Sequence, residues 1–593
     1  MRQFIIIGIY LFISYALLAQ KTQDWRNIEN ALSEIPNENY VDQPYVVVAK
    51  NGDWVCVLTT GPGSESQKGQ HIVASISSNR GKSWSELIDI EKTEDPPSSW
   101  GIPYITPYGR IYIFYTFNGD KIDSFPNGES LNHNTELGWY CFKYSDDNGR
   151  TWSDRYRIPM RETTVDYLNP WNGKVQLFWG ISKPFDLENK MYFSFTKMAI
   201  HPQDMGEGFL YKSENINFEK DPKKIKWELL PEGNTGISYT PLGVTQEEHN
   251  IVPLNNGDLY CMYRTSEGYP ANTYSKDKGK TWSIPEYAKY ADGRVIKNPR
   301  ACPRVFKTSN GKYLLWFHNN NIKGYKGHRN PVWISGGIEV DGKILWSQPE
   351  VLLYGQEGIF GMSYPDLIEE NGKYWITETQ KTIARVHLID NEFLENLWKQ
   401  GVVKERITRG LIFEKSNIPA KTNITSLRLP RLRNGSLSIE LLLDVNELVP
   451  GQVILENSDE KGNGITISIS NQRTVEIVLL SNGQKTSFDT DPGAVAVGVN
   501  HIVFNIDGES KLLTSVVNGE LCDGGRYRLQ GWSWFPSDID QVNGNEIIRI
   551  APLFDGKVSM LRIYGRYLTT TEAISNYRSQ LFAKTKTFNN GGR

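Results

Sequence analysis

The chain has 593 residues, more than one ordinary domain contains, so we expect at least two domains. Its 65 basic and 68 acidic side chains nearly balance, and neither a basic stripe nor an acidic tail points to a nucleic-acid partner. The 17 Trp and 30 Tyr residues suit either β-sheet cores or sugar binding through the ring faces.

The first residues, MRQFIIIGIYLFISYALLAQ, combine a basic start at Arg2, an apolar run and small residues near Ala16 and Ala19. This pattern is typical of a secretory signal peptide over residues 1–19, and a retained membrane anchor is the alternative. No later apolar run approaches the roughly 20 residues that a membrane span requires. The sequence therefore predicts a secreted or periplasmic protein without a membrane span, and we expect a monomer.

The rest of the chain favours β-structure. Short runs rich in Val, Ile, Tyr, Phe and Trp are broken by Gly, Asn and Asp, as in YVVVAKNGDWVCVLTT and RIYIFYTFNGD. The NG turns between such runs are hairpin signals, so we predict an all-β chain. The cysteines have no metal-site spacing, and we expect them to be buried apolar residues, with one disulfide left open; they lie at positions 56, 141, 261, 302 and 522. No cofactor or metal is predicted, although acidic runs in the C-terminal region leave a Ca²⁺ ion open.

A short turn recurs at 77–84 (SSNRGKSW), 144–152 (YSDDNGRTW) and 274–282 (YSKDKGKTW). Asp147 and Asp277 can accept hydrogen bonds from the backbone of their turns, and the glycine two positions later supplies a positive φ. The closing Trp of each copy can pack into a hydrophobic seam. Trp227 and Trp346 extend the series, and the spacing predicts a six-bladed β-propeller over residues 25–405, whose first strand closes the ring with the last blade.

The pattern of residues along the chain changes after about residue 405. We predict a linker at 410–423 (GLIFEKSNIPAKTN) and a β-sandwich over 424–585. The segment FDGKVSMLRIYGRYLTTTEAISNYRS resembles the closing strand and short helix of laminin-G or concanavalin-like sandwiches. Such modules either bind sugars or brace the main domain.

The repeated turn matches the Asp-box, S-x-D-x-G-x-T-W, and the propeller thus resembles the sialidase superfamily. Two copies match fully, and Asn79 replaces Asp in the first. The resemblance implies a Glu and an Arg across a hairpin, a further Arg before a strand, and a Tyr in the last blade. In this chain these are Glu248, Arg264, Arg329 and Tyr364. It also implies that the arginines hold a substrate carboxylate and that Glu248 takes the proton of Tyr364, which is the nucleophile in sialidases.

Two positions depart from the sialidase pattern. Asp42, in VDQPYVV, stands where the family has a carboxylate-binding Arg, and the loop GPGSESQKGQHIVAS lacks the acid/base Asp and offers Glu65 as a substitute. Candidate replacements come from three histidines and one arginine. His71, His249 and His318 are candidate proton-transfer groups, and Arg300 is a candidate third contact to the carboxylate.

These residues suit β-elimination at a terminal uronate, because arginines that neutralise the ring carboxylate ease removal of the neighbouring proton. We therefore predict an exported enzyme, a lyase or a dehydratase, that acts at the non-reducing end of an acidic, ulvan-like oligosaccharide or polysaccharide. One alternative is a retaining, sialidase-type exo-glycosidase with Tyr364 as nucleophile. The other is a non-catalytic glycan-binding protein.

Overall fold

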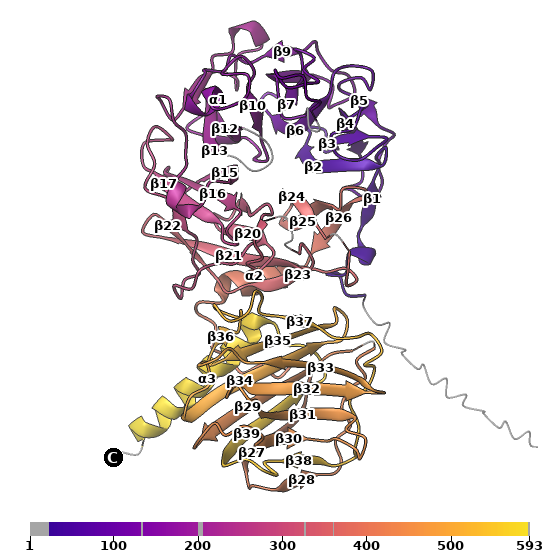
Figure 1. The fold of residues 1–593 in the computed structure, drawn as a ribbon, viewed down its shortest axis with the longest axis vertical. Coiled ribbons are helices and arrows are strands. Elements are labelled where there is room, and N and C mark those ends of the chain that lie inside the picture. The colour runs from indigo at the N-terminus through magenta and orange to yellow at the C-terminus, as the bar shows by residue number, and fades with distance from the viewer. Residues whose placement is uncertain are drawn as a thin grey trace, which may run out of the picture.

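The computed structural model describes residues 23–590 except 132–134, 200–204, 325–327, 360 and 434, and side chains up to residue 581. The predicted signal peptide, residues 1–19, lies outside the described residues. Two β-domains follow one another along the chain, and Figure 1 shows a ring of small sheets above a sandwich of two larger ones. Within the described part, no helix is long and apolar enough to cross a membrane.

Six antiparallel sheets form the blades of the propeller, each running from an inner strand outwards. Blade 1 comprises β2 (Tyr40–Val48), β3 (Trp54–Gly61), β4 (His71–Ser77) and β5 (Ile88–Asp89). Blade 2 comprises β6 (Ser98–Ile105), β7 (Ile111–Phe117), β8 (Trp139–Ser145) and β9 (Tyr156–Arg157). Blade 3 comprises β10 (Leu177–Trp179), β11 (Phe185–Leu187), β12 (Lys190–Met198), β13 (Gly206–Ser213) and β14 (Glu228–Leu230).

Blade 4 comprises β15 (Gln246–Pro253), β16 (Leu259–Thr265), β17 (Ala271–Ser275) and β18 (Glu286–Tyr287). Blade 5 comprises β19 (Arg304–Lys307), β20 (Tyr313–Phe317), β21 (Val332–Val340), β22 (Lys343–Trp346) and β23 (Glu350–Leu353). Blade 6 comprises β24 (Ser363–Glu370), β25 (Lys373–Thr379) and β26 (Ala384–Ile389). The N-terminal strand β1 (Ser33–Ile35) pairs with β26 and completes this last blade, which confirms the predicted ring closure. The short helices are η1 (Ile28–Asn30), α1 (Thr164–Tyr167), η2 (Pro222–Lys224), η3 (Thr240–Leu242) and α2 (Asn391–Lys399).

The Asp-box turns form as the sequence predicts. Asp147 Oδ1 accepts from the backbone N–H of Thr151 at 2.9 Å, and the Ser145 hydroxyl accepts from the N–H of Gly149 at 2.8 Å. Gly149 has φ of +86°, where a Cβ would be strained. The incomplete copy closes in the same way, because Asn79 Oδ1 accepts from Ser83 N–H at 2.9 Å. The turn needs an acceptor at this position, and an amide oxygen supplies it as a carboxylate does.

The C-terminal domain is a sandwich of two antiparallel sheets. One sheet holds β27 (Leu411–Ile418), β39 (Gly556–Tyr564), β29 (Leu437–Val445), β34 (Gly498–Asp507), β35 (Leu512–Val517), β36 (Glu520–Leu521) and β37 (Ser533–Trp534). The other holds β28 (Thr422–Ile424), β38 (Ile548–Ile550), β30 (Val453–Glu456), β31 (Gly464–Ile469), β32 (Val475–Ser481) and β33 (Gln484–Asp489). Helix α3 (Thr570–Asn590) ends the described chain.

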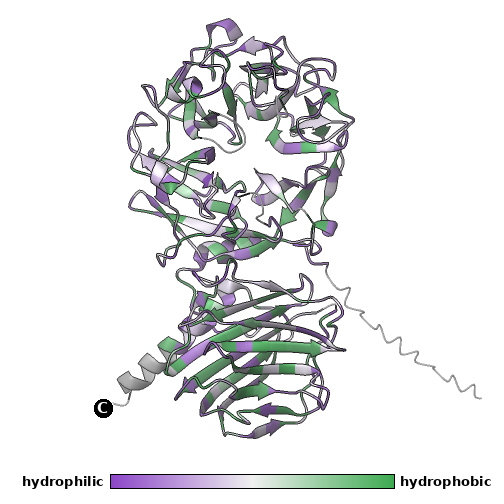
Figure 2. Ribbon diagram, viewed as in Figure 1, coloured by the Kyte–Doolittle hydropathy of each residue, from purple (hydrophilic) through white to green (hydrophobic). Residues whose placement is uncertain are grey.

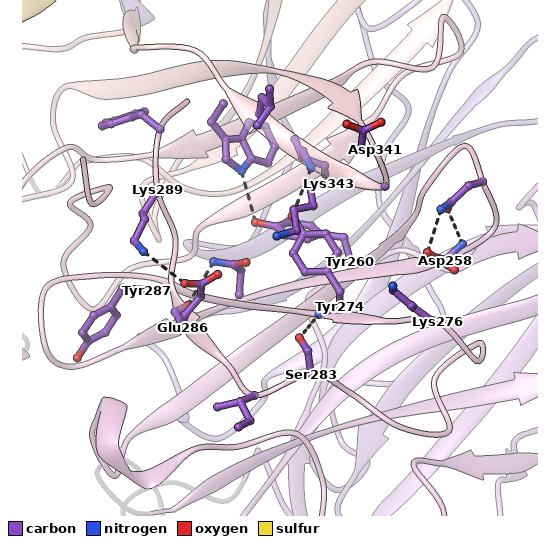
Figure 3. Close-up of a pocket in the computed structure, with 18 residues that line it drawn as sticks. Asp258, Tyr260, Tyr274, Lys276, Ser283, Glu286, Tyr287, Lys289, Asp341 and Lys343 are labelled. Atoms are coloured by element: carbon purple, nitrogen blue, oxygen red, sulfur yellow. Dashed lines mark hydrogen bonds and ion pairs between the residues drawn. The ribbon is translucent and has the colours of Figure 1, made fainter. Parts of the chain in front are cut away.

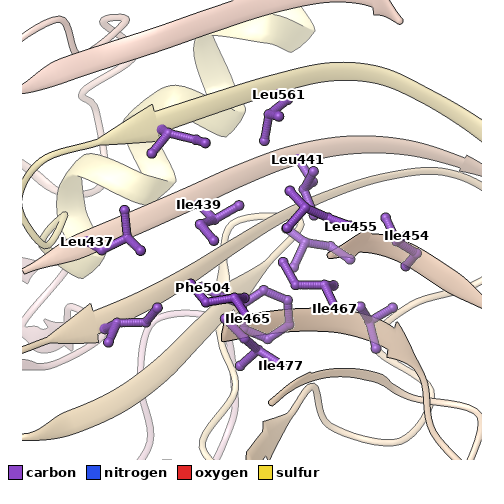
Figure 4. Close-up of a cluster of buried hydrophobic side chains, with 14 of the residues drawn as sticks. Leu437, Ile439, Leu441, Ile454, Leu455, Ile465, Ile467, Ile477, Phe504 and Leu561 are labelled. Carbon is purple, nitrogen blue, oxygen red and sulfur yellow. The ribbon is translucent and has the colours of Figure 1, made fainter. Parts of the chain in front are cut away.

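Alternation along the strands builds the core of the sandwich. Apolar residues alternate along β29 from Leu437 to Val445 and belong to this core, and Figure 4 shows Leu437, Ile439 and Leu441 near Ile465, Ile467 and Phe504 from other strands. Figure 2 shows the apolar residues concentrated along the same strands. The domain thus has a core of its own.

Residues 410–423, predicted as a linker, instead contribute two strands to the sandwich. Strand β27 pairs with β39 and lies at the edge of its sheet, and β28 pairs with β38. All four β27 side chains from Glu414 to Asn417 are exposed, as is common in edge strands, so the local sequence is polar and does not signal a strand.

The sandwich packs directly against blade 5. A shared hydrophobic cluster contains Phe317 and Trp333 of the propeller together with Val503 and Trp532 of the sandwich. The buried ammonium group of Lys297 donates to the carbonyls of Asp523 and Arg528 at 2.7 and 2.8 Å. This sandwich loop therefore supports the propeller segment that leads to Arg300.

Candidate active site

β-Bulges in four inner strands aim side chains toward the centre of the ring. The register slips between Asp42 and Tyr45, Ser99 and Ile102, Glu247 and Asn250, and Ser363 and Asp366. Each bulge holds one non-glycine residue at positive φ: Gln43 at +49°, Trp100 at +62°, Glu248 at +57° and Tyr364 at +45°. Such conformations are costly and mark positions where the surrounding structure fixes a side chain, often at functional sites.

Two of these strained residues contact each other across the ring. The Tyr364 hydroxyl donates to Glu248 Oε1 at 2.8 Å, and Arg264 Nη1 lies 2.5 Å from the same oxygen. All three side chains are nearly inaccessible. The structure thus brings together three of the residues that the sialidase resemblance indicated, from blades 4 and 6.

A second carboxylate organises the arginines. Arg264 Nε donates to Glu247 Oε2 at 2.8 Å, and Arg300 Nη2 donates to Glu247 Oε1 at 2.9 Å. Arg329 donates from Nη1 to the Ser363 hydroxyl at 2.6 Å and from Nη2 to the Arg300 carbonyl at 3.2 Å. Arg264, Arg300 and Arg329 therefore lie in one network beside Tyr364.

Lys381, which the sequence did not indicate, also belongs to the cluster. Its Nζ lies 2.6 Å from Asp42 Oδ2 and 3.1 Å from Glu65 Oε1, and it sits 4.8 Å from the centre of the Tyr364 ring. Asp42 also accepts from the Tyr40 hydroxyl at 3.0 Å. Asp42, which stands where the family has an arginine, and Glu65, the candidate substitute for the acid/base Asp, are thus paired with one cation. No local motif marks Lys381, which follows β25 in the turn QKT.

The electrostatic environment keeps the phenol protonated and Lys381 charged. Burial, reinforced by the Glu248 carboxylate, raises the pKa of Tyr364 well above its ordinary value of 10.0, and Arg264 only partly offsets this. Burial alone would lower the pKa of Lys381, but the carboxylates of Asp42 and Glu65 outweigh it and raise that pKa. In the resting site Tyr364 is therefore a hydrogen-bond donor with a carboxylate acceptor in place.

The hydrogen bonds and ring contacts of the predicted histidines go to residues other than Tyr364 and Glu248, although His318 lies near Arg329. His249 is buried, stacks 4.4 Å from the Tyr263 ring and contacts Thr196, and burial lowers its pKa to about 3. Because Glu248 occupies the bulge, the His249 side chain that follows it packs between blades 3 and 4. His71 contacts the Gly69 carbonyl at 2.9 Å and lies within 4 Å of Glu38 and Asp89, all in blade 1.

His318 is buried against Trp316, and burial lowers its pKa to about 3. The five cysteines are free and buried, so the disulfide that the sequence left open does not form. Among the residues that the structure describes, no group of three or more His, Cys, Asp or Glu side chains is arranged to hold a metal ion.

Comparisons with known proteins agree with this architecture. Residues 101–376 match the family described as BNR repeat-like domain, and residues 420–573 match the Concanavalin A-like lectin/glucanases superfamily. These matches confirm the predicted resemblance of the two domains, a sialidase-like propeller followed by a concanavalin-like sandwich. A search of curated protein sequences finds no match.

Several solved structures resemble the chain at low identity. A protein of unknown function from Dyadobacter fermentans is 15% identical, with 60% of this chain and 98% of that chain covered and a TM-score of 0.47. Trypanosoma rangeli sialidase with 2,3-difluorosialic acid is 13% identical, with coverages of 91% and 94% and a TM-score of 0.43. The Ruminococcus gnavus intramolecular trans-sialidase is 14% identical, with coverages of 61% and 97% and a TM-score of 0.44. Because these TM-scores are below 0.5, the fold assignment rests on the strand pairing.

Proposed function

We propose that this protein cleaves or dehydrates the non-reducing end of an acidic oligosaccharide by β-elimination at a terminal uronate, with Tyr364 as the proton-transfer group. The observation that carries the proposal is the 2.8 Å hydrogen bond from the Tyr364 hydroxyl to Glu248, beside a network of arginines. A phenol with a carboxylate already in place to take its proton is equipped to act as a base.

The proposed reaction begins with the uronate carboxylate bound by Arg329 and Lys381, which withdraws charge and acidifies the C5–H bond. The Tyr364 oxygen takes the C5 proton while its own proton passes to Glu248 Oε1. Electrons of the C5–H bond form the C4–C5 alkene, and the C4–O bond breaks. Tyr364 then donates its proton to the departing O4, and Glu248 returns the other proton to Tyr364.

One tyrosine serving as both base and acid fits the surroundings of the site. His71 and His249 make their contacts outside the cluster, and His318, although near Arg329, is fully buried against Trp316, so we assign the proton transfers at C5 and O4 to no imidazole. The Tyr364–Glu248 pair needs no further proton carrier.

Cationic side chains of the cluster suit a substrate carboxylate. Arg264 pairs with Glu248, Arg300 pairs with Glu247, and Lys381 pairs with Asp42 and Glu65. Arg329 lies beside them and donates to the Ser363 hydroxyl. Guanidinium groups can bind a carboxylate through two parallel hydrogen bonds, which supports an acidic substrate.

A retaining glycosidase with Tyr364 as nucleophile is the second candidate. The contact that favours it is the 3.1 Å approach of Glu65 to Lys381, which itself lies 4.8 Å from the Tyr364 ring. Glu65 could then occupy the acid/base role that the sialidase pattern assigns to an Asp in this loop.

Incubation with a panel of uronate- and sialate-ended oligosaccharides, read by mass and by ultraviolet absorbance of the conjugated alkene, separates these reactions. We expect alkene formation by the wild-type chain and its loss in Tyr364→Phe. Tyr115→Phe is the matched control, because it removes another buried hydrogen bond from a tyrosine to a glutamate, Glu91, in blade 2. Hydrolysis without an alkene would establish the glycosidase instead. Binding without turnover, or full activity of Tyr364→Phe, would refute the role given to Tyr364.

A further inference from the structure

A second concave site lies at the other end of the strands that carry the candidate active site. Glu248 stands near the start of β15 and Arg264 near the end of β16, whereas the hairpin that joins these strands, 254–258, is at their opposite end. At this opposite end a cavity of about 530 Å³ opens between blades 4 and 5 (Figure 3). Its volume lies within the range of roughly 300–1,000 Å³ that is typical of small-molecule sites.

Aromatic rings held by hydrogen bonds line this cavity: Tyr260 and Trp346 are buried, whereas Tyr274 and Tyr287 are partly exposed. The Tyr260 and Tyr274 rings lie 4.9 Å apart, and Trp346 Nε1 donates to the Tyr260 hydroxyl at 3.4 Å. The Tyr274 hydroxyl accepts from the backbone N–H of Ile344 at 3.3 Å, which links blade 4 to blade 5. At the rim, Ile284 is 74% exposed, which places apolar surface beside the aromatic rings.

The rim carries charges of both signs, only some of which are paired. Lys289 pairs with Glu286 at 3.4 Å. Within the described part of the chain, Lys276 and Lys343 have no carboxylate within 4 Å, although both line the cavity with Asp341 (Figure 3). Their ammonium groups are thus available as donors next to acceptors on the same rim.

We propose that this cavity is a second glycan-binding site, which holds neutral sugar units of a glycan chain on the face opposite Tyr364. Aromatic and apolar surface suits the C–H faces of a sugar ring, and adjacent ammonium and carboxylate groups suit its hydroxyls, which both donate and accept. A polyanion would be repelled by the acidic half of the rim, and a polycation by the basic half. The site binds without catalysis and is independent of the chemistry proposed at Tyr364.

The test is a printed array of neutral and uronate-containing oligosaccharides, probed with the full chain carrying Tyr364→Phe so that bound sugars are not turned over. We expect binding to at least one neutral oligosaccharide. Adding Lys276→Ala with Lys343→Ala should weaken that binding at least tenfold, and so should adding Tyr274→Ala. Lys82→Ala, an exposed lysine in the equivalent turn of blade 1, is the control and should leave binding unchanged.

If Tyr274→Ala does not fold, the variant with Lys276→Ala and Lys343→Ala still tests the proposal, because both lysines are exposed. An array without any bound neutral glycan would overturn the proposal, as would binding that survives the lysine substitutions. Turnover of short soluble substrates by the lysine variant in the wild-type Tyr364 background should be unchanged. The array thus tests the second site and the turnover assay tests the proposed function, so failure of one can be distinguished from failure of the other.

Discussion

Glu350 joins the two domains at the first turn of helix α3. Its carboxylate lies on β23 of the propeller and accepts from the backbone N–H groups of Thr570 and Thr571, at 2.9 and 2.8 Å, in the sandwich domain. Burial raises the pKa of Glu350 to about 7, and these two N–H groups only partly oppose the effect. The interface is therefore expected to respond to pH in the neutral range.

The size of the response follows from linkage. Because the folded pKa of about 7 lies above the ordinary value of 4.5, the protonated form favours the folded state. The stability gained in this way is complete below about pH 4.5 and is lost as the pH rises through about 7. The difference between the two pKa values corresponds to about 3 kcal/mol, of which about 2.5 kcal/mol falls between about pH 5 and about pH 8.

Urea unfolding of the wild type and of Glu350→Gln at these two pH values measures the effect. Taking the difference between the two proteins cancels the contributions of other titrating groups. Gln cannot ionise, so the stability of the wild type relative to the variant should fall by about 2.5 kcal/mol from about pH 5 to about pH 8. A constant offset of about 1 kcal/mol is expected because one N–H faces the amide nitrogen. A difference that does not change with pH would refute the reasoning.

Three further predictions concern the site and the blades. Glu248→Gln removes the acceptor of the Tyr364 proton and should lower kcat by about 100-fold or more in the alkene assay, while an unchanged kcat would contradict the relay. Lys297→Met leaves the Asp523 and Arg528 carbonyls without their donor, which should lower the free energy of unfolding in urea by about 1–3 kcal/mol and also lower kcat/KM. If stability falls but the kinetics do not change, the sandwich braces the propeller without influencing the site. Asp277→Ala removes the hydrogen bonds from Thr281 and should destabilise the propeller by about 1 kcal/mol, measured as a lower Tm, with Lys276→Ala as the neighbouring control.

The fold was predictable because its signals are local and repeated. An Asp-box needs only an acceptor, a positive-φ glycine and a packing Trp within eight residues, and three copies at blade spacing determine the architecture. The strands at 411–418 and 422–424 were missed for the opposite reason. Their pairing partners, β39 and β38, lie more than a hundred residues away, and the exposed face of an edge strand has the composition of a loop.

The sequence predicted only those site residues that could be aligned individually with the sialidase pattern. Glu248, Arg264 and Tyr364 lie together as the sialidase resemblance implies. Its position directly after Glu248 makes His249 a candidate, yet the bulge at Glu248 interrupts the alternation of side chains and the imidazole is buried between blades 3 and 4. Bulges depend on backbone strain that adjacent residues do not reveal.

The effect of Asp42, which stands where the sialidase pattern has an arginine, depends on its contact with Lys381. Considered alone, a buried carboxylate at this point would repel an anionic sugar. Lys381 neutralises it from the last blade, 339 residues away in the chain, and the contact exists only because the ring closes. Lys381 also contacts Glu65, and these contacts hold its ammonium group beside Tyr364. A variant that removes Lys381 should therefore lose anionic ligands, and removal of Asp42 in the same chain should restore part of that loss.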